Sequence, residues 1–189
     1  MYHIKKDKRT LKSSELIYEG LLKCLEIKEF NKITISDIEH YSTVSRSTFY
    51  RLFDSLEDIL SMKCDYCFKE VLENYITHPS IESGKLDFVK YFFSYWFEHS
   101  KLLEILFSIN RIDIIYNSIS HNSHILTDFY KSKSTFPIKN WEYSIAIRTG
   151  IFLVILFKWI QNGKKETVDE LVEILSSQLR FLSKSDLIF

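Results

Sequence analysis

The scarcity of glycine and proline is the feature that most constrains the fold of this chain. Its 189 residues include 4 Gly and 2 Pro, so the sequence offers few helix breakers and few tight turns. A β fold of many short strands needs frequent turns, whereas a bundle of long helices does not. No stretch of sequence sustains the apolar alternation of period two that is typical of strands. The sequence therefore predicts an all-α fold.

Apolar periodicity and capping signals predict where the helices lie. Hydrophobic residues make up 46% of the chain, which is enough to form a core. The segment 78–85 contains Pro79 and Gly84 and is expected to be a junction between helices. The expected helices span residues 10–28, a short segment after Thr34, then 46–52, 55–75, 86–99, 101–109, 113–131, 139–161 and 168–183. We expect two domains, residues 1–55 and residues 56–189.

Two short helices joined by a brief turn are expected in the first domain. Thr34 and Asp37 form a capping box that begins one helix, and Ser45 can cap the next. On the second helix, Phe49, Leu52 and Phe53 are apolar at i, i+3 and i+4 and predict an inward face. The residues that project elsewhere are Arg46, Ser47, Thr48 and Tyr50. A cation, two hydroxyls and a phenol at the start of such a helix suit phosphates and base edges, as in a helix-turn-helix.

The charge of the chain is unevenly distributed, although its formal net charge is zero. Residues 1–53 contain ten basic and seven acidic side chains. The excess lies before and at the start of the first helix, at Lys5, Lys6, Lys8 and Arg9. A short basic arm there suits phosphates or a minor groove. On charge alone, a solubilising tail is an equal alternative.

Three segments of this region resemble the DNA-binding domain of the TetR/AcrR family of transcriptional regulators. They are residues 33–38 (ITISDI), 44–50 (VSRSTFY) and 52–60 (LFDSLEDIL), and the resemblance covers about residues 10–60. It implies that Thr34 and Ser45 cap the second and third helices. It also implies that Arg46, Ser47, Thr48 and Tyr50 face DNA and that Phe53 locks the third helix onto the first.

Two positions depart from the family pattern. Thr43 stands where the family has a turn glycine, so the turn must accept a β-branched residue. Leu56 stands where the family has a lysine that approaches a phosphate, so one backbone contact is expected to be missing. These departures lend slight support to an alternative, a diverged helical protein-interaction module with weak DNA binding.

Aromatic residues make up 15% of the chain and must fill a core, an interface or a pocket. An effector pocket between helices of the second domain is one hypothesis, and plain core packing is an equal alternative. The candidate pocket residues are Phe88, Phe92, Tyr95, Trp96 and Trp141.

The last two helices are expected to form a homodimer interface. The resemblance implies a four-helix interface there, and the nearly all-round apolarity of residues 145–160 independently predicts burial by the chain and by a partner. The candidate interface residues are Ile151, Ile155, Trp159, Leu171 and Leu175.

Other classes of function have less support in the sequence. Cys64, Cys67, His121 and His124 have the spacing of two metal half-sites, but paired helical cysteines are commonly buried hydrophobes. We therefore expect no metal and no cofactor, and a metal-sensing module is the less favoured alternative. No catalytic triad, glycine-rich phosphate loop or paired carboxylates indicate an enzyme.

Three cysteines and the lack of a signal peptide favour the cytoplasm. The apolar run 145–160 contains Arg148 and Lys158 and is shorter than the roughly 20 residues of a membrane span, so no membrane partner is expected. The resulting hypothesis is a dimeric transcriptional regulator, a repressor released from palindromic operator DNA by a small-molecule effector.

Overall fold

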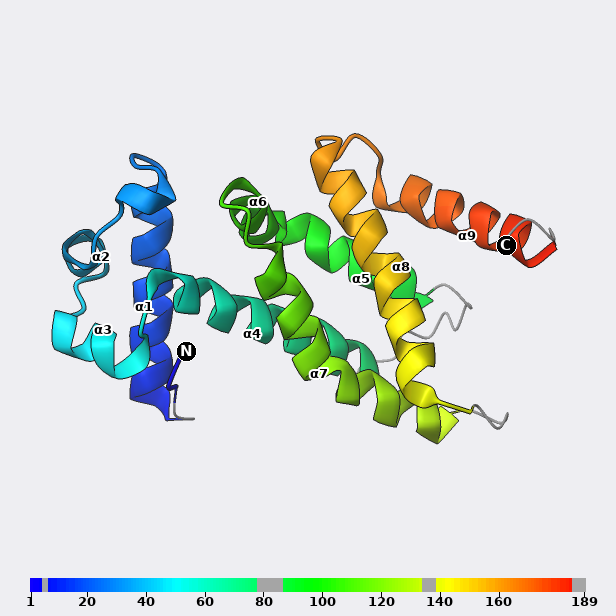
Figure 1. The fold of residues 1–189 in the computed structure, drawn as a ribbon, viewed down its shortest axis with the longest axis horizontal. Coiled ribbons are helices and arrows are strands. Elements are labelled where there is room, and N and C mark those ends of the chain that lie inside the picture. The colour runs from blue at the N-terminus through cyan, green and yellow to red at the C-terminus, as the bar shows by residue number, and fades with distance from the viewer. Residues whose placement is uncertain (5–6, 78–86, 134–138, 185–189) are drawn as a thin grey trace. The chain divides into compact units, whose positions relative to one another are not determined.

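The structure is a computed structural model that describes residues 1–4, 7–77, 87–133 and 139–184. Over these residues the fold is all-α, as predicted, with one isolated β-bridge between Tyr2 and Phe53 and no strand (Figure 1). The helices are α1 (Lys8–Leu25), the 3-10 turn η1 (Phe30–Lys32), α2 (Ile35–Ser42), α3 (Arg46–Leu52), α4 (Leu56–Thr77), α5 (Asp87–Glu98), α6 (Ser100–Ser108), α7 (Ile112–Lys133), α8 (Trp141–Gln161) and α9 (Val168–Lys184).

The capping residues that predicted where two helices begin are present in the structure. Thr34 and Asp37 form the predicted capping box of α2, with Thr34 Oγ1 accepting from the Asp37 amide and Asp37 Oδ2 accepting from the Thr34 amide. The hydroxyl of Ser45 accepts from the Thr48 amide at the start of α3. These bonds satisfy amides that a first helical turn leaves without intrahelical partners.

The chain divides into two compact units that differ from the expected domains at 1–55 and 56–189. The first unit comprises Met1–Cys67 and Ile105–Ser118, and the second comprises Phe68–Glu104 and Ile119–Phe189. The first unit therefore includes the beginning of α4 and the α6–α7 turn. Within it, Arg111 of that turn pairs with Asp113 at 2.8 Å and with Glu57 of α4 at 3.8 Å.

In the first unit, α1, α2 and α3 contact one another around a closely packed core (Figure 1). Gly20 allows α1 to approach Ser42 of α2, because a Cβ atom at Gly20 would lie 2.8 Å from the Ser42 Cβ. The rings of Phe49 and Phe53 lie 5.8 Å apart between centroids. The fully buried apolar side chains of this core include Ile17, Leu21, Ile38, Phe49, Leu52 and Phe53.

In the second unit, aromatic side chains of α5 occupy the interior, and α5 packs against α9. Trp159 near the end of α8 is 1% exposed, and its Nε1 donates to the Glu166 carbonyl at 2.9 Å. The chain then turns through Gly163 and Lys164, both with positive φ, and Lys164 Nζ binds Ser100 at 2.9 Å and Glu104 at 2.5 Å. These contacts fix the turn from α8 to α9 within this unit.

Helix α8 begins two residues later than the expected helix at 139–161, and part of its apolar surface is exposed. It spans 21 residues, and by length and composition alone it could cross a membrane, while 22% of its most apolar window is buried. These criteria are weak grounds for a membrane span, since core helices of proteins outside membranes meet them as well. The chain buries Leu153, Leu156 and Trp159 and leaves Ile147 and Val154 65% and 66% exposed, while the expected burial by a partner stays a prediction.

Candidate nucleic-acid interface and apolar cavity

Helix α3 has one face in the core and one face exposed, as its composition predicted. Phe49 and Leu52 are 1% and 2% exposed, whereas Tyr50 is 59% exposed. The side chains of Arg46 and Ser47 are exposed, and that of Thr48 is half-buried. The structure therefore brings a cation, two hydroxyls and a phenol onto the first two turns of one short helix.

The capping residues at the two helix starts use their hydroxyls locally. Ser45 Oγ lies 3.1 Å from Ser47 Oγ and donates to Thr48 Oγ1 at 3.2 Å, so three hydroxyls form a connected group. Thr34 Oγ1 donates to Asp37 Oδ2 at 2.8 Å within the capping box of α2. Thr48 Oγ1 accepts within the group of three hydroxyls, so its own hydrogen is available to an acceptor outside the helix.

The turn between α2 and α3 accommodates a β-branched residue in a left-handed conformation. Thr43 has φ 58° and ψ 16°, and its amide donates to the Glu39 carbonyl at the end of α2. This is the position at which glycine is favoured, because a Cβ atom is disfavoured in that region. The hydroxyl of Ser42 then accepts from the Val44 amide at 3.1 Å and holds the turn.

Asp37 ties the start of α2 to the segment that follows α1. Its Oδ1 accepts from Lys28 Nζ at 2.6 Å, while Oδ2 serves the cap at Thr34. The pKa of Asp37 is lowered to about 2, first by the Lys28 hydrogen bond and then by the amide and hydroxyl of Thr34. The carboxylate is therefore ionised throughout the neutral range.

The structure describes part of the predicted basic arm and the residues that precede it. Residues 1–4 lie along the end of α3, where the His3 amide donates to the Leu52 carbonyl at 2.8 Å and the Tyr2 hydroxyl binds Asp65 at 2.5 Å. Lys8 and Arg9 are exposed but belong to the first turn of α1, which Asp7 caps. Lys8 and Arg9 therefore belong to the helix itself, which begins two residues before the expected start at residue 10, and their role at DNA stays a prediction. Lys5 and Lys6 lie outside the described residues.

Two residues that sequence reasoning missed surround Arg46. Glu39 Oε2 accepts from Arg46 Nε at 3.1 Å, and a terminal nitrogen of Arg46 also donates to the Ser36 hydroxyl. Both partners belong to α2. Their distances of seven and ten residues from Arg46 along the chain span the turn, so no helical spacing rule identifies them.

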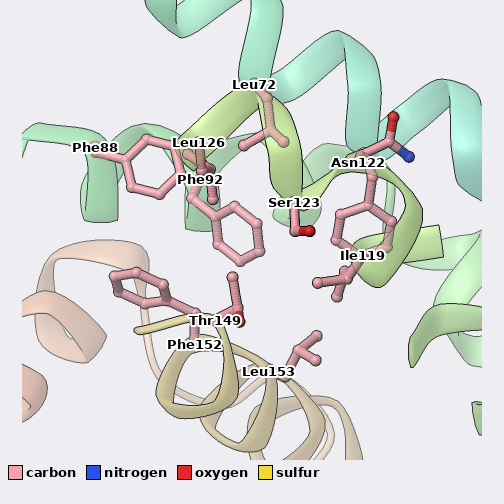
Figure 2. Close-up of a pocket in the computed structure, with 11 residues that line it drawn as sticks. Leu72, Phe88, Phe92, Ile119, Asn122, Ser123, Leu126, Thr149, Phe152 and Leu153 are labelled. Atoms are coloured by element: carbon pink, nitrogen blue, oxygen red, sulfur yellow. The ribbon is translucent and has the colours of Figure 1, made fainter. Parts of the chain in front are cut away.

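An apolar cavity lies in the second unit (Figure 2). Its volume is about 20 Å³, which by this measure is close to the space of one water molecule. Figure 2 shows the Phe88, Phe92 and Phe152 rings on one side of it and Ile119 and Leu153 on the other. The remaining lining residues are Phe68, Leu72, Asn122, Ser123, Leu126 and Thr149.

The polar groups of this cavity carry no charge. Ser123 Oγ donates to the Ser120 carbonyl and Thr149 Oγ1 donates to the Ile145 carbonyl, both at 2.8 Å. Both hydroxyl hydrogens are thus used within their own helices, which leaves oxygen lone pairs. No ionisable side chain belongs to the lining. The lining would therefore leave a buried charge uncompensated.

The structure separates the residues predicted for this pocket. Phe88 and Phe92 line the cavity, whereas Trp96 is fully buried beside it, 4.6 Å from Phe68 between ring centroids. Tyr95 is half-buried and donates its hydroxyl to Glu70 at 2.7 Å, and the half-buried Trp141 lies at the start of α8. Tyr95, Trp96 and Trp141 are therefore not lining residues. Phe152 and Thr149 of α8 were missed because the apolar residues of that helix do not mark one face.

The predicted dimer interface needs a similar correction. Trp159, Leu171 and Leu175 are 1%, 5% and 3% exposed, so the chain itself buries them and they cannot face a partner. Ile151 and Ile155 are half-buried. A different apolar set is exposed on the last two helices, namely Tyr143, Ile147 and Val154 of α8 with Ile174 and Leu179 of α9.

The cysteine and histidine pairs do not form a metal-binding group in the described residues. Cys64 is fully buried, and burial raises the pKa of its thiol far above the ordinary value. His121 and His124 are exposed, with His124 Nδ1 3.0 Å from the His121 carbonyl. Across the described ranges, no three His, Cys, Asp or Glu side chains converge as metal ligands would.

Comparison with known proteins gives a fold and no family. No family model and no curated protein matches the sequence. Among solved structures, the chain is similar to Lin0861 from Listeria innocua, with 19% sequence identity and a TM-score of 0.75. The match covers 95% of this chain and 96% of Lin0861. At this identity the similarity concerns the fold alone, which the two chains share over almost their whole length.

Proposed function

We propose that this protein is a DNA-binding transcriptional regulator of the TetR/AcrR type. The observation that carries the proposal is the exposed polar face of α3. Arg46, Ser47 and Tyr50 are exposed there, while Phe49 and Leu52 anchor the helix in the core. A short capped helix that follows another across a tight turn has the geometry of a helix-turn-helix recognition helix. The capping of α2 by Thr34 supports the same reading.

The proposed DNA contacts fall into two groups. Arg46, Ser47, Thr48 and Tyr50 would reach base edges and phosphates of one major groove. The exposed Lys8 and Arg9 at the start of α1 would bind phosphates. In a dimer, two copies of α3 would read half-sites whose centres lie about 34–36 Å apart, or further apart on a longer operator. A palindromic operator would match the twofold symmetry of the protein.

The proposed dimer uses the exposed apolar face of α8 and α9. Tyr143, Ile147 and Val154 lie on one stripe of α8 at i, i+4 and i+11, and they are 71%, 65% and 66% exposed. Ile174 and Leu179 of α9 are 48% and 39% exposed and are further apolar residues that a partner would cover. A second copy presents the same face, so an isologous contact would cover the apolar surfaces of both chains.

The proposed effector is an uncharged, mainly apolar small molecule that binds the cavity lined by Phe88, Phe92 and Phe152. The observed volume of about 20 Å³ is too small for such a molecule. Binding would therefore select a conformation in which the cavity is open. If that conformation binds DNA more weakly, the effector releases the operator from a cytoplasmic repressor. No cofactor is required.

Selection of DNA from a random duplex pool by the purified protein tests the proposal. We expect a palindromic consensus, a dimer by sedimentation and an affinity that falls steeply with salt. Arg46→Ala should weaken binding to the selected duplex and leave the oligomeric state unchanged. A well-folded chain that enriches no sequence and binds duplexes without salt dependence would contradict the proposal and favour a helical protein-interaction module.

A further inference from the structure

Arg46 forms an ion pair with a carboxylate on the neighbouring helix. Glu39 of α2 accepts two hydrogen bonds from this residue, one from the side-chain Nε at 3.1 Å and one from the backbone amide at 3.4 Å. The hydroxyl of Ser36, one turn earlier on α2, accepts a third from the end of the guanidinium. The arginine therefore folds back across the turn onto α2.

The pair lies in the open, where DNA could reach both partners. The side chains of Arg46 and Glu39 are 56% and 44% exposed. Asp37, the other acidic residue of α2, differs because Lys28 and the helix cap already engage its two oxygens. Glu39 is thus an accessible carboxylate beside the cation that the proposed function places at the DNA.

Phosphate groups and base edges would respond differently to this carboxylate. A phosphate is an anion, so it competes with Glu39 for the guanidinium and is repelled by the carboxylate that it approaches. The guanine edge, with O6 and N7, is neutral and accepts two hydrogen bonds from terminal guanidinium nitrogens. Arg46 can keep its Nε bond to Glu39 and offer those nitrogens to guanine, because one guanidinium has five N–H donors.

We infer that Glu39 is a specificity-determining residue that directs Arg46 toward base edges and away from phosphates. This inference rests on the proposed DNA-binding function. Glu39 acts through Arg46 and is a positioning residue. It weakens binding to random DNA more than binding to the selected operator, and so widens the ratio between the two affinities.

Glu39→Gln tests the inference in the full-length protein. Its affinities for the selected duplex and for a duplex of random sequence are measured over a range of salt concentrations beside those of the wild type. The variant should bind random DNA more tightly, since Arg46 is free to take a phosphate. Each subunit should then release about 0.9 more counterions. The gain in affinity for random DNA should shrink roughly threefold per subunit when the salt concentration rises fourfold. The ratio of the affinity for the selected duplex to the affinity for random DNA should also fall.

Two further variants separate the role of Arg46 from that of overall charge. Glu19→Gln makes the same charge change at an exposed position of α1 and should leave salt dependence and specificity near wild type. Combining Glu39→Gln with Arg46→Ala should abolish the effect of the first substitution, because the residue through which it acts is gone. Circular dichroism melts establish that every variant is folded.

Each remaining outcome decides against one of the proposals. If neither the wild type nor Glu39→Gln binds any duplex, the proposed function fails, and the role of Glu39 fails with it. If the wild type selects an operator but Glu39→Gln behaves as Glu19→Gln does, the role of Glu39 is wrong and DNA binding stands. If the effect of Glu39→Gln persists without Arg46, the carboxylate repels DNA directly and the inference is overturned.

Discussion

Gly20 of α1 and Ser42 of α2 lie so close that a Cβ atom on Gly20 would be 2.8 Å from the Ser42 Cβ and 3.0 Å from its amide nitrogen. Gly20→Ala should therefore force the two helices apart. Overpacking of this kind costs about 1–3 kcal/mol, while the gain in helix propensity is up to about 1 kcal/mol. We expect a net loss of about 1 kcal/mol in the free energy of unfolding, measured by urea denaturation.

The exposed neighbour Glu19 supplies the control for this prediction. Glu19→Ala places a methyl group on the same helix but on its exposed side. Its effect should stay within about 0.5 kcal/mol. Equal stability of Gly20→Ala and the wild type would mean that α1 and α2 are not in close contact at this point.

Thr43→Gly should stabilise the protein. Thr43 occupies the left-handed region with φ 58°, where a residue with a Cβ atom loses roughly 1–2 kcal/mol. Glycine removes that cost but makes the unfolded chain more flexible, which lowers the free energy of unfolding by about 0.4–1 kcal/mol. The net gain should be about 0.5–1 kcal/mol and should raise Tm by about 1–4 °C. Thr43→Ala, which keeps a Cβ atom, should give less than this gain, and a lower Tm for the glycine variant would contradict the strain argument.

A charge on the exposed face of α8 should dissociate the proposed dimer. Val154→Glu would bury a carboxylate between two apolar surfaces, which is unfavourable unless it is paired. Sedimentation should show a monomer, and affinity for the selected duplex should fall because two half-sites are no longer bound together. Ile27→Glu, at a residue 61% exposed after α1, should remain a dimer. A dimeric Val154→Glu would move the interface elsewhere.

Asp37 should contribute to the fall in the free energy of unfolding at low pH. Its folded-state pKa of about 2 lies below the ordinary value, which is near 3.9 in an unfolded chain. A lowered folded-state pKa gives stability that is present above the unfolded pKa and is lost as pH falls through the folded one. Between about pH 4 and pH 2, the wild type should therefore lose stability more steeply than Asp37→Asn. Glu26→Gln, at an exposed position, should follow the wild-type slope.

Shortening Phe152 should open the cavity of the second unit. Phe152 is half-buried, and its ring lies 5.9 Å from Phe88 and 5.8 Å from Phe92 between centroids. Phe152→Ala should lower stability by about 2–3 kcal/mol, slightly less than is typical of a fully buried phenylalanine. Benzene should then raise the Tm of the variant more than that of the wild type, whereas benzoate should not. Equal shifts for benzene and benzoate would show that charge does not govern entry.

The sequence predicted best those features that depend on near neighbours. Thr34 and Ser45 mark the starts of α2 and α3 because a cap acts over three residues. The inward face of α3 followed from the spacing of Phe49 and Leu52. The left-handed turn at Thr43 followed from the resemblance alone, since a threonine does not itself indicate positive φ.

The sequence predicted less well which face of an apolar helix packs in the core and which face is exposed. Helix α8 is apolar on several sides, so neither the buried position of Trp159 nor the exposure of Val154 could be derived from spacing. The same ambiguity hid Phe152 from the predicted pocket. The Glu39–Arg46 pair was missed for another reason, since it depends on the angle between two helices.

The contact between Tyr2 and Asp65 closes a loop of 63 residues within the first unit. Contacts between α2 and α3, such as that of Arg46 with Glu39, span seven residues. Loop closure costs more conformational entropy as the loop grows, so the helix pair should assemble early in folding and the N-terminal residues should dock late. Residues 1–4 would then be among the last residues of the first unit to reach their native places, and their docking would complete the folding of that unit.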